Sequence, residues 1–178
     1  REVDEVTRRI KELNDELERR VRRAKERIEE LNKRVNREDE EIVDRVRKLN
    51  DELAKDNKRE LVDEVLKETE KLIRRSEESV RRVLEETEKL IETLRREVEK
   101  VLRETERLIK EVVERRKDDE DVKRKLKEVV DESRRTVDEI RRELERVVEK
   151  SRKNIEEVKK HTREVLKRSE ETARELKK

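Results

Sequence analysis

An 18-residue repeat constrains the fold of this chain more than any other feature. The segment VLKETEKLI at residues 65–73 returns as VLEETEKLI at 83–91 and as VLRETERLI at 101–109. Eighteen residues make five turns of an α-helix at about 3.6 residues per turn. A pattern kept at this interval therefore stays on one side of a helix. Such a repeat specifies how helices pack, and it contains no catalytic motif.

The composition supports an ordered, all-α protein. The 178 residues include no Gly, Pro, Cys, Met or aromatic residue, and 61% of them are charged. Low hydrophobicity with this much charge ordinarily favours disorder, but the net charge is only +2 and the apolar residues are strictly periodic. The lack of cysteine excludes disulfides and thiolate metal sites.

The apolar stripes divide the chain into three long helices. We predict helices at about 2–55, 58–116 and 119–177, forming one domain over 1–178. The first break is KDNKRE, where Asn57 and Glu60 have the spacing of a capping box, and the second is the acidic KDDED, which suits the start of a helix. Residues 36–41 could instead form a loop in which Asp39 is the N-cap of a new helix. A continuous helix is favoured because the apolar rows keep their phase across this segment.

Three helices of similar length with short connections predict an up-down-up antiparallel three-helix bundle. Each apolar stripe is about 120° wide, which suits a helix that faces two neighbours. A repeat of 3.6 residues per turn also predicts long, nearly straight helices with little supercoiling.

Polar residues recur inside the stripes at the same interval. On antiparallel helices, residues at the same level have numbers that add up to a constant. In each of the three layers named below, the numbers of the Asn and the Thr add up to 119, and those of the Thr and the Ser add up to 238. An unpaired buried polar group costs about 1–3 kcal/mol, so groups at one level are expected to bond one another and set the register of the helices. Alternatively, Ser and Thr bond the carbonyl four residues earlier in their own helix. The three predicted layers are Asn14, Thr105 and Ser133; Asn32, Thr87 and Ser151; and Asn50, Thr69 and Ser169.

No residue pattern indicates catalysis. His161 is the only histidine, and Val158 occupies the position that a Glu-x-x-His metal motif would require. We interpret His161 as a surface or hydrogen-bonding residue, and expect no catalytic residue, no metal site and no cofactor. The chain is therefore not expected to be an enzyme.

Charge distribution argues against nucleic-acid and membrane partners. Each third of the chain has nearly equal numbers of cations and anions, so there is no basic stripe for phosphates. No run of about 18 apolar residues exists to span a membrane, and no signal peptide is recognisable. We expect a soluble chain with no partner, located in the cytoplasm of an expression host, although weak self-association remains compatible with the stripes.

The whole chain resembles a computationally designed, parametrically generated helical bundle of the straight, untwisted class with buried hydrogen-bond networks. The resemblance rests on the VLxETExLI repeats, the ELNDEL and KLNDEL segments, the Ala, Val, Ile and Leu core and the polar layers. It implies a stable scaffold, folded as a monomer, without an evolved biochemical function. The alternatives are a helical module that associates with itself or a partner, and a natural rod-like spacer.

Overall fold

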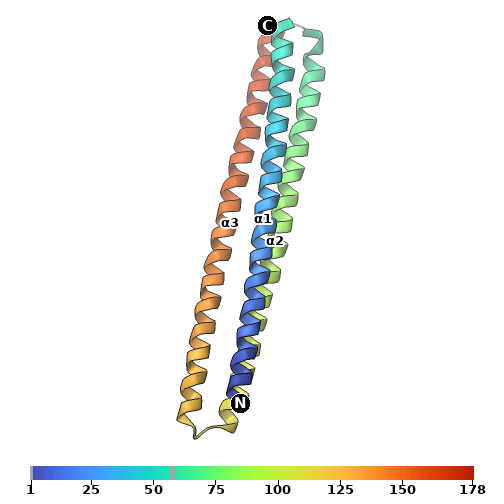
Figure 1. Ribbon diagram of the computed structural model, residues 1–178. Helices are drawn as coiled ribbons and strands as arrows, with labels where there is room; N and C mark the ends of the chain where they lie inside the picture. Colours follow the sequence, from blue (N-terminus) through green and yellow to red (C-terminus); the bar gives the residue numbers. More distant parts are fainter. Residues whose placement is uncertain (1, 57–58) are drawn as a thin grey trace. The chain divides into compact units, whose positions relative to one another are not determined.

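The computed structural model describes residues 2–56 and 59–178, which are almost entirely helical (Figure 1). Helix α1 spans Glu2–Asp56, a short 3-10 helix spans Arg59–Leu61, α2 spans Val62–Arg115 and α3 spans Glu120–Lys177. No strand occurs in these residues. The predicted all-α, up-down-up three-helix fold is confirmed.

The chain divides into two compact units. Unit 1 contains Arg1–Arg27 and Glu88–Val148, and unit 2 contains Ile28–Thr87 and Glu149–Lys178. Each of the three helices contributes one segment to each unit. Both units are thus three-helix bundles with their own core.

The core of unit 1 joins the start of α1 to the end of α2 and the start of α3. Ile10 and Leu126 are each 1% exposed, and burying an aliphatic side chain of this size contributes about 1.5–3 kcal/mol. Because early residues of α1 meet late residues of α2, the two helices are antiparallel. The buried cluster consists of Val6, Ile10, Val112, Val122 and Leu126.

Unit 2 has three successive core clusters in which all three helices take part. The first cluster contains Leu31, Val35, Val80, Val83, Ile155 and Val158. The next contains Ile42, Val46, Leu72 and Val165. The last contains Leu53, Val62 and Ala173. Residue numbers rise along α1 and fall along α2 through these clusters, so the antiparallel arrangement holds here as well.

Helix α1 continues without a break through residues 36–41, as the phase of the apolar rows predicted. Asp39 therefore caps no helix, and its side chain is buried instead. The continuous helix fits the sequence because the segment has no Gly or Pro to interrupt the backbone hydrogen bonds.

The two connections differ in how the following helix starts. Asp119 is the N-cap of α3, since its Oδ1 accepts hydrogen bonds from the backbone N–H groups of Asp121 (3.1 Å) and Val122 (3.2 Å). The capping box predicted at Asn57 lies outside the described residues. Its partner Glu60 belongs to the 3-10 turn Arg59–Leu61, so the α-helix begins at Val62 rather than near residue 58. Tightening of this kind is common at helix ends.

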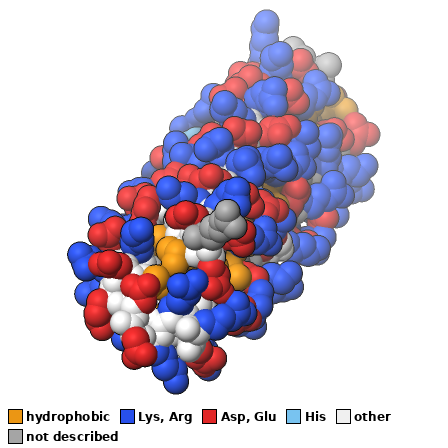
Figure 2. All heavy atoms as spheres, turned by 60° about the horizontal axis from the view of Figure 1, so that its bottom comes forward, with side chains coloured by type: hydrophobic (Ala, Val, Ile, Leu, Met, Phe, Trp, Pro, Cys, Tyr) orange, Lys and Arg blue, Asp and Glu red, His pale blue; other side chains and the backbone are white. Residues whose placement is uncertain are grey.

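The surface mixes charges of both signs. On the face drawn in Figure 2, Lys and Arg side chains alternate with Asp and Glu side chains, and hydrophobic side chains show only in small patches. Several contacts join residues four apart in α2, including Glu70 with Arg74 at 3.7 Å, Glu78 with Arg82 at 3.5 Å and Glu99 with Arg103 at 3.6 Å. Exposed pairs like these add little stability. Across the described segments, no helix is long and apolar enough to cross a membrane.

Candidate functional site: buried polar residues between the helices

In unit 1, Asn14 of α1 and Ser133 of α3 bond each other in the core. Asn14 Nδ2 donates to the carbonyl of Ile10 at 2.8 Å and to Ser133 Oγ at 3.1 Å. The serine hydroxyl also lies 3.3 Å from Asn14 Oδ1, to which it donates. Thr105 of α2 is 5% exposed, but its hydroxyl has no hydrogen-bond partner in the described part of the chain. The structure thus joins two of the three residues expected at this level.

Unit 2 repeats this pair 18 residues further along each helix. Asn32 Nδ2 donates to the carbonyl of Ile28 at 2.8 Å and to Ser151 Oγ at 3.1 Å. Asn154 adds a bond of 2.9 Å from its Nδ2 to Asn32 Oδ1. The hydroxyl of the buried Thr87 again has no hydrogen-bond partner among the described residues.

For the residues expected in the third layer, Asn50, Thr69 and Ser169, the described part of the chain contains no bond across helices. Asn50 Nδ2 donates to the carbonyl of Val46 at 2.8 Å. Its Oδ1 and the hydroxyls of Thr69 and Ser169 are buried without a partner in the described segments. In all three places the asparagine amide bonds the carbonyl four residues earlier, whereas the alternative interpretation assigned such bonds to Ser and Thr.

A further buried polar cluster in unit 2 was not predicted. Asp39 Oδ2 lies 3.2 Å from Nδ1 of His161, and the hydroxyls of Ser76 and Thr162 lie 3.3 Å apart. The Asp39 side chain is only 7% exposed and that of His161 is 54% exposed. Three sequence signals point to this cluster: Asp39 stands in the row of Val3 and Val21, Ser76 interrupts an apolar stripe, and His161 is the only histidine.

Burial dominates the electrostatics of Asp39. Removal of its carboxylate from water raises the pKa of Asp39, while the hydrogen bond and charge of His161 oppose this rise and the charge of Glu40 adds to it. A hollow of about 320 Å³ between α1 and α3 is lined by Asp39, His161, Arg47 and Arg168, among others. Within the described residues, no group of three or more His, Cys, Asp or Glu could hold a metal ion.

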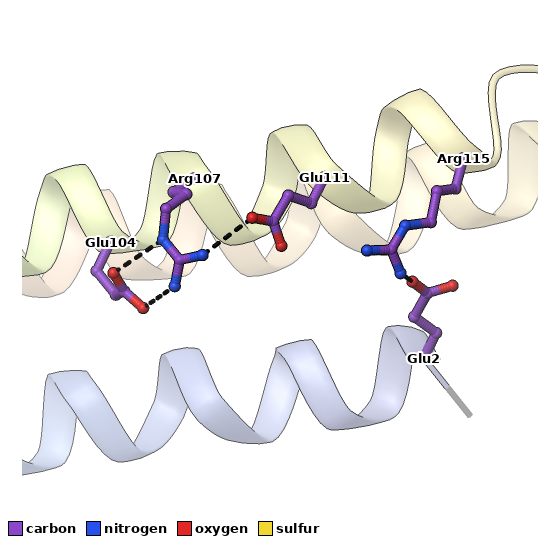
Figure 3. Close-up of polar contacts among 5 residues, drawn as sticks. All are labelled: Glu2, Glu104, Arg107, Glu111 and Arg115. Atoms are coloured by element: carbon purple, nitrogen blue, oxygen red, sulfur yellow. Dashed lines mark hydrogen bonds and ion pairs between the residues drawn. The ribbon is translucent and has the colours of Figure 1, made fainter.

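Exposed ion pairs run along α2 in unit 1 (Figure 3). Arg107 donates to Glu104 at 2.5 Å and to Glu111 at 2.9 Å, and its hydrogen bond lowers the pKa of Glu104. Arg115 bonds Glu2 and so joins the end of α2 to the start of α1. These side chains pair with each other on the surface.

The architecture defines the class: an all-α protein whose fold is an antiparallel three-helix bundle. Among solved structures, the chain is similar to one described as a computationally designed three helix bundle, with 20% sequence identity and a TM-score of 0.65. The match covers 99% of this chain and 93% of the other. At this identity the likeness shows the fold. No protein-family model and no curated protein matches the sequence.

Proposed function

We propose that this chain is a designed structural scaffold, folded as a monomeric three-helix bundle, in which buried Asn and Ser residues set the register of α1 against α3. It has no evolved biochemical activity and takes no cofactor. The 18-residue repeat, the restricted composition and the likeness to a designed bundle all support this proposal.

The repeated Asn–Ser pair is the observation that carries the proposal. Asn14 with Ser133 and Asn32 with Ser151 have matching distances at matching separations of 119 residues. Sliding α3 by four residues would bring valine or isoleucine against both asparagines and remove their bonds to the serines, at a cost of about 1–3 kcal/mol for each buried group left unpaired. Polar groups that penalise other registers are a known means of specifying one packing.

Size-exclusion chromatography with multi-angle light scattering tests the monomer. We expect a constant mass near 22.0 kDa over a wide range of concentration, because most residues of each apolar stripe are buried within the chain. A mass of two or more chains would contradict the scaffold proposal and favour a helical interaction module.

Distance measurements test the register. Because the sequence has no cysteine, Glu18→Cys in α1 and Asp138→Cys in α3 provide unique sites for spin labels. We expect one label distance in the parent, and a second distance, shifted by up to about one turn or 5.4 Å, when Asn14→Leu and Asn32→Leu are combined.

The matched control places the same substitutions one residue further along, at the exposed Asp15 and Lys33. Asp15→Leu with Lys33→Leu should leave the single distance unchanged. If the two asparagine substitutions also leave it unchanged, the apolar core and connections set the register without the polar pairs.

A further inference from the structure

A groove between α2 and α3 in unit 1 has the dimensions of a small-molecule site. Its volume is about 1030 Å³, near the upper end of the range typical of ligand pockets, about 300–1,000 Å³. Its lining runs from Glu99 to Val113 on α2 and from Val130 to Arg141 on α3. The α3 segment alone is about 16 Å long at 1.5 Å per residue. The groove therefore has the elongated form that accommodates an extended chain.

The lining of this groove includes five aliphatic side chains beside the buried Thr105 and Ser133. Leu102, Ile109, Val113 and Val130 are all partly exposed, while Val137 is buried beneath them. Because the sequence contains no aromatic residue, the apolar part of the groove offers a flexible ligand aliphatic contacts and no ring to stack on. An unbranched alkyl chain matches this surface.

Cations outnumber anions along the rim of the groove. The lining contains five cations and three anions. Arg103 and Arg107 are paired with acids of their own helix, and Figure 3 shows Arg107 held between two glutamates. Lys110, Arg134 and Arg141 make no ion pair in the described part of the chain, so they are available to an anionic group.

We propose that the α2–α3 groove of unit 1 binds a monomeric long-chain carboxylate. Its alkyl chain lies along Leu102, Ile109 and Val113, and its head group meets the unpaired cations of the rim, Arg134 and Arg141 above all. A binding site of this kind goes beyond the scaffold role, and it does not depend on the chain having been designed.

Isothermal titration calorimetry with dodecanoate, kept below its micelle concentration, tests the head-group contacts. We expect one dodecanoate per chain and an affinity at least about tenfold lower when Arg134→Glu and Arg141→Glu are combined. The repeat supplies the control, because Arg152 and Lys159 stand 18 residues later on the same face of α3 and outside the groove. Arg152→Glu with Lys159→Glu changes the net charge equally and should alter the affinity less than about twofold.

A second matched pair tests the alkyl contacts. Leu102→Ser should weaken dodecanoate binding several-fold, whereas Leu84→Ser, at the equivalent exposed position one repeat earlier, should not. Circular dichroism on every variant shows whether it is folded, and Arg134→Gln with Arg141→Gln replaces the charge reversal if that variant unfolds.

Three results would overturn the proposal. Equal weakening by the control pair would mean that dodecanoate adsorbs to cationic surface in general. Equal binding of the uncharged dodecyl maltoside would remove the role of the head group. The free protein could also have the mass of two chains, and Leu102→Ser could reduce it to the mass of one. This result would mean that a second copy covers the groove.

Discussion

Asp39 combines two opposing electrostatic effects at one residue. Its side chain lies in the apolar row that begins with Val3 and Val21, where burial penalises the carboxylate, and its hydrogen bond to His161 partly offsets that penalty. The raised pKa of Asp39 shows that burial is the larger effect. One carboxylate oxygen, Oδ1, has no hydrogen-bond partner among the described residues, which explains why the pair does not fully compensate.

The sign of this shift predicts how Asp39→Asn changes stability with pH. Because the pKa of Asp39 is raised in the folded chain above its usual value of about 3.9, the folded state binds the proton more tightly than the unfolded state. The contribution of this proton binding to the free energy of unfolding is fully present below about pH 4 and is lost as pH rises through the raised pKa of Asp39. We therefore expect Asp39→Asn to stabilise the chain at pH 7 by about 1 kcal/mol and to have little effect near pH 3.

Urea denaturation followed by circular dichroism at both pH values measures this difference. The other charged and titratable groups around the hollow are present in both chains: Glu40, Asp44 and Arg47 from α1, and His161, Glu164 and Arg168 from α3. Asp51→Asn, at an exposed position of α1, is the control. A parent chain more stable than Asp39→Asn at pH 7 would mean that the His161 pair outweighs burial.

Asn14 and Asn50 are predicted to respond differently to the same substitution. Asn14→Leu leaves the hydroxyl of Ser133 without its partner, whereas Asn50→Leu removes an amide whose Oδ1 is already unpaired. The two positions are 36 residues apart in the same repeat phase, so the change is matched. We expect Asn14→Leu to be less stable than Asn50→Leu by about 1–2 kcal/mol in thermal or urea denaturation. Equal stabilities would mean that the Asn14–Ser133 hydrogen bond contributes no more to the free energy of unfolding than the hydrogen bonds these groups make to water in the unfolded chain.

Residue-level detail was only partly predictable from the sequence. Constant sums of residue numbers place groups at one level along the helices, and Asn14 and Ser133 indeed meet. They do not give the direction in which a side chain points, so they could not show that the Thr69 and Ser169 hydroxyls have no hydrogen-bond partner among the described residues. Asp39 stands in an apolar row, so its burial follows from helical phase, but its bond to His161 was missed because His161 lies near the edge of the α3 stripe, where phase alone does not give the direction of a side chain.

Helices were far more predictable than side-chain contacts. A periodic stripe some 50 residues long leaves no other secondary structure that hides its apolar residues from water. The described helices α1 and α3 begin and end within one or two residues of the expected positions. The start of α2 differs by more, because the tight turn at Arg59–Leu61 depends on local backbone geometry, which cannot be predicted from the spacing of apolar residues.

Capping of α3 predicts a measurable effect at the level of one helix. Asp119→Ala removes the acceptor for the backbone N–H groups of Asp121 and Val122, so we expect a loss of about 1 kcal/mol in the free energy of unfolding. Asp118→Ala is the control, since it removes a neighbouring exposed acid of the same charge that caps nothing. Similar losses in the two variants would assign the effect to charge near the helix start rather than to the cap.

At the scale of the whole chain, we propose that residues 1–178 behave as a single cooperative domain although they form two compact units. Each helix passes from one unit to the other without a break: α1 between Arg27 and Ile28, α2 between Thr87 and Glu88, and α3 between Val148 and Glu149. Unfolding one unit alone would expose unsatisfied backbone groups at three new helix ends. Costly helix ends of this kind favour unfolding of both units together.

Asp39→Val tests this coupling because it changes only unit 2. The substitution restores the apolar row of Val3 and Val21 and removes a buried charge, so we expect it to stabilise the chain by about 1–3 kcal/mol. Native-state hydrogen exchange then compares the amides of Val137 in unit 1 and Ile155 in unit 2, two buried residues 18 apart in α3. If unfolding is global, both amides gain protection by the same factor, about fivefold or more. A gain confined to Ile155 would mean that the units open independently and that the continuous helices do not couple them.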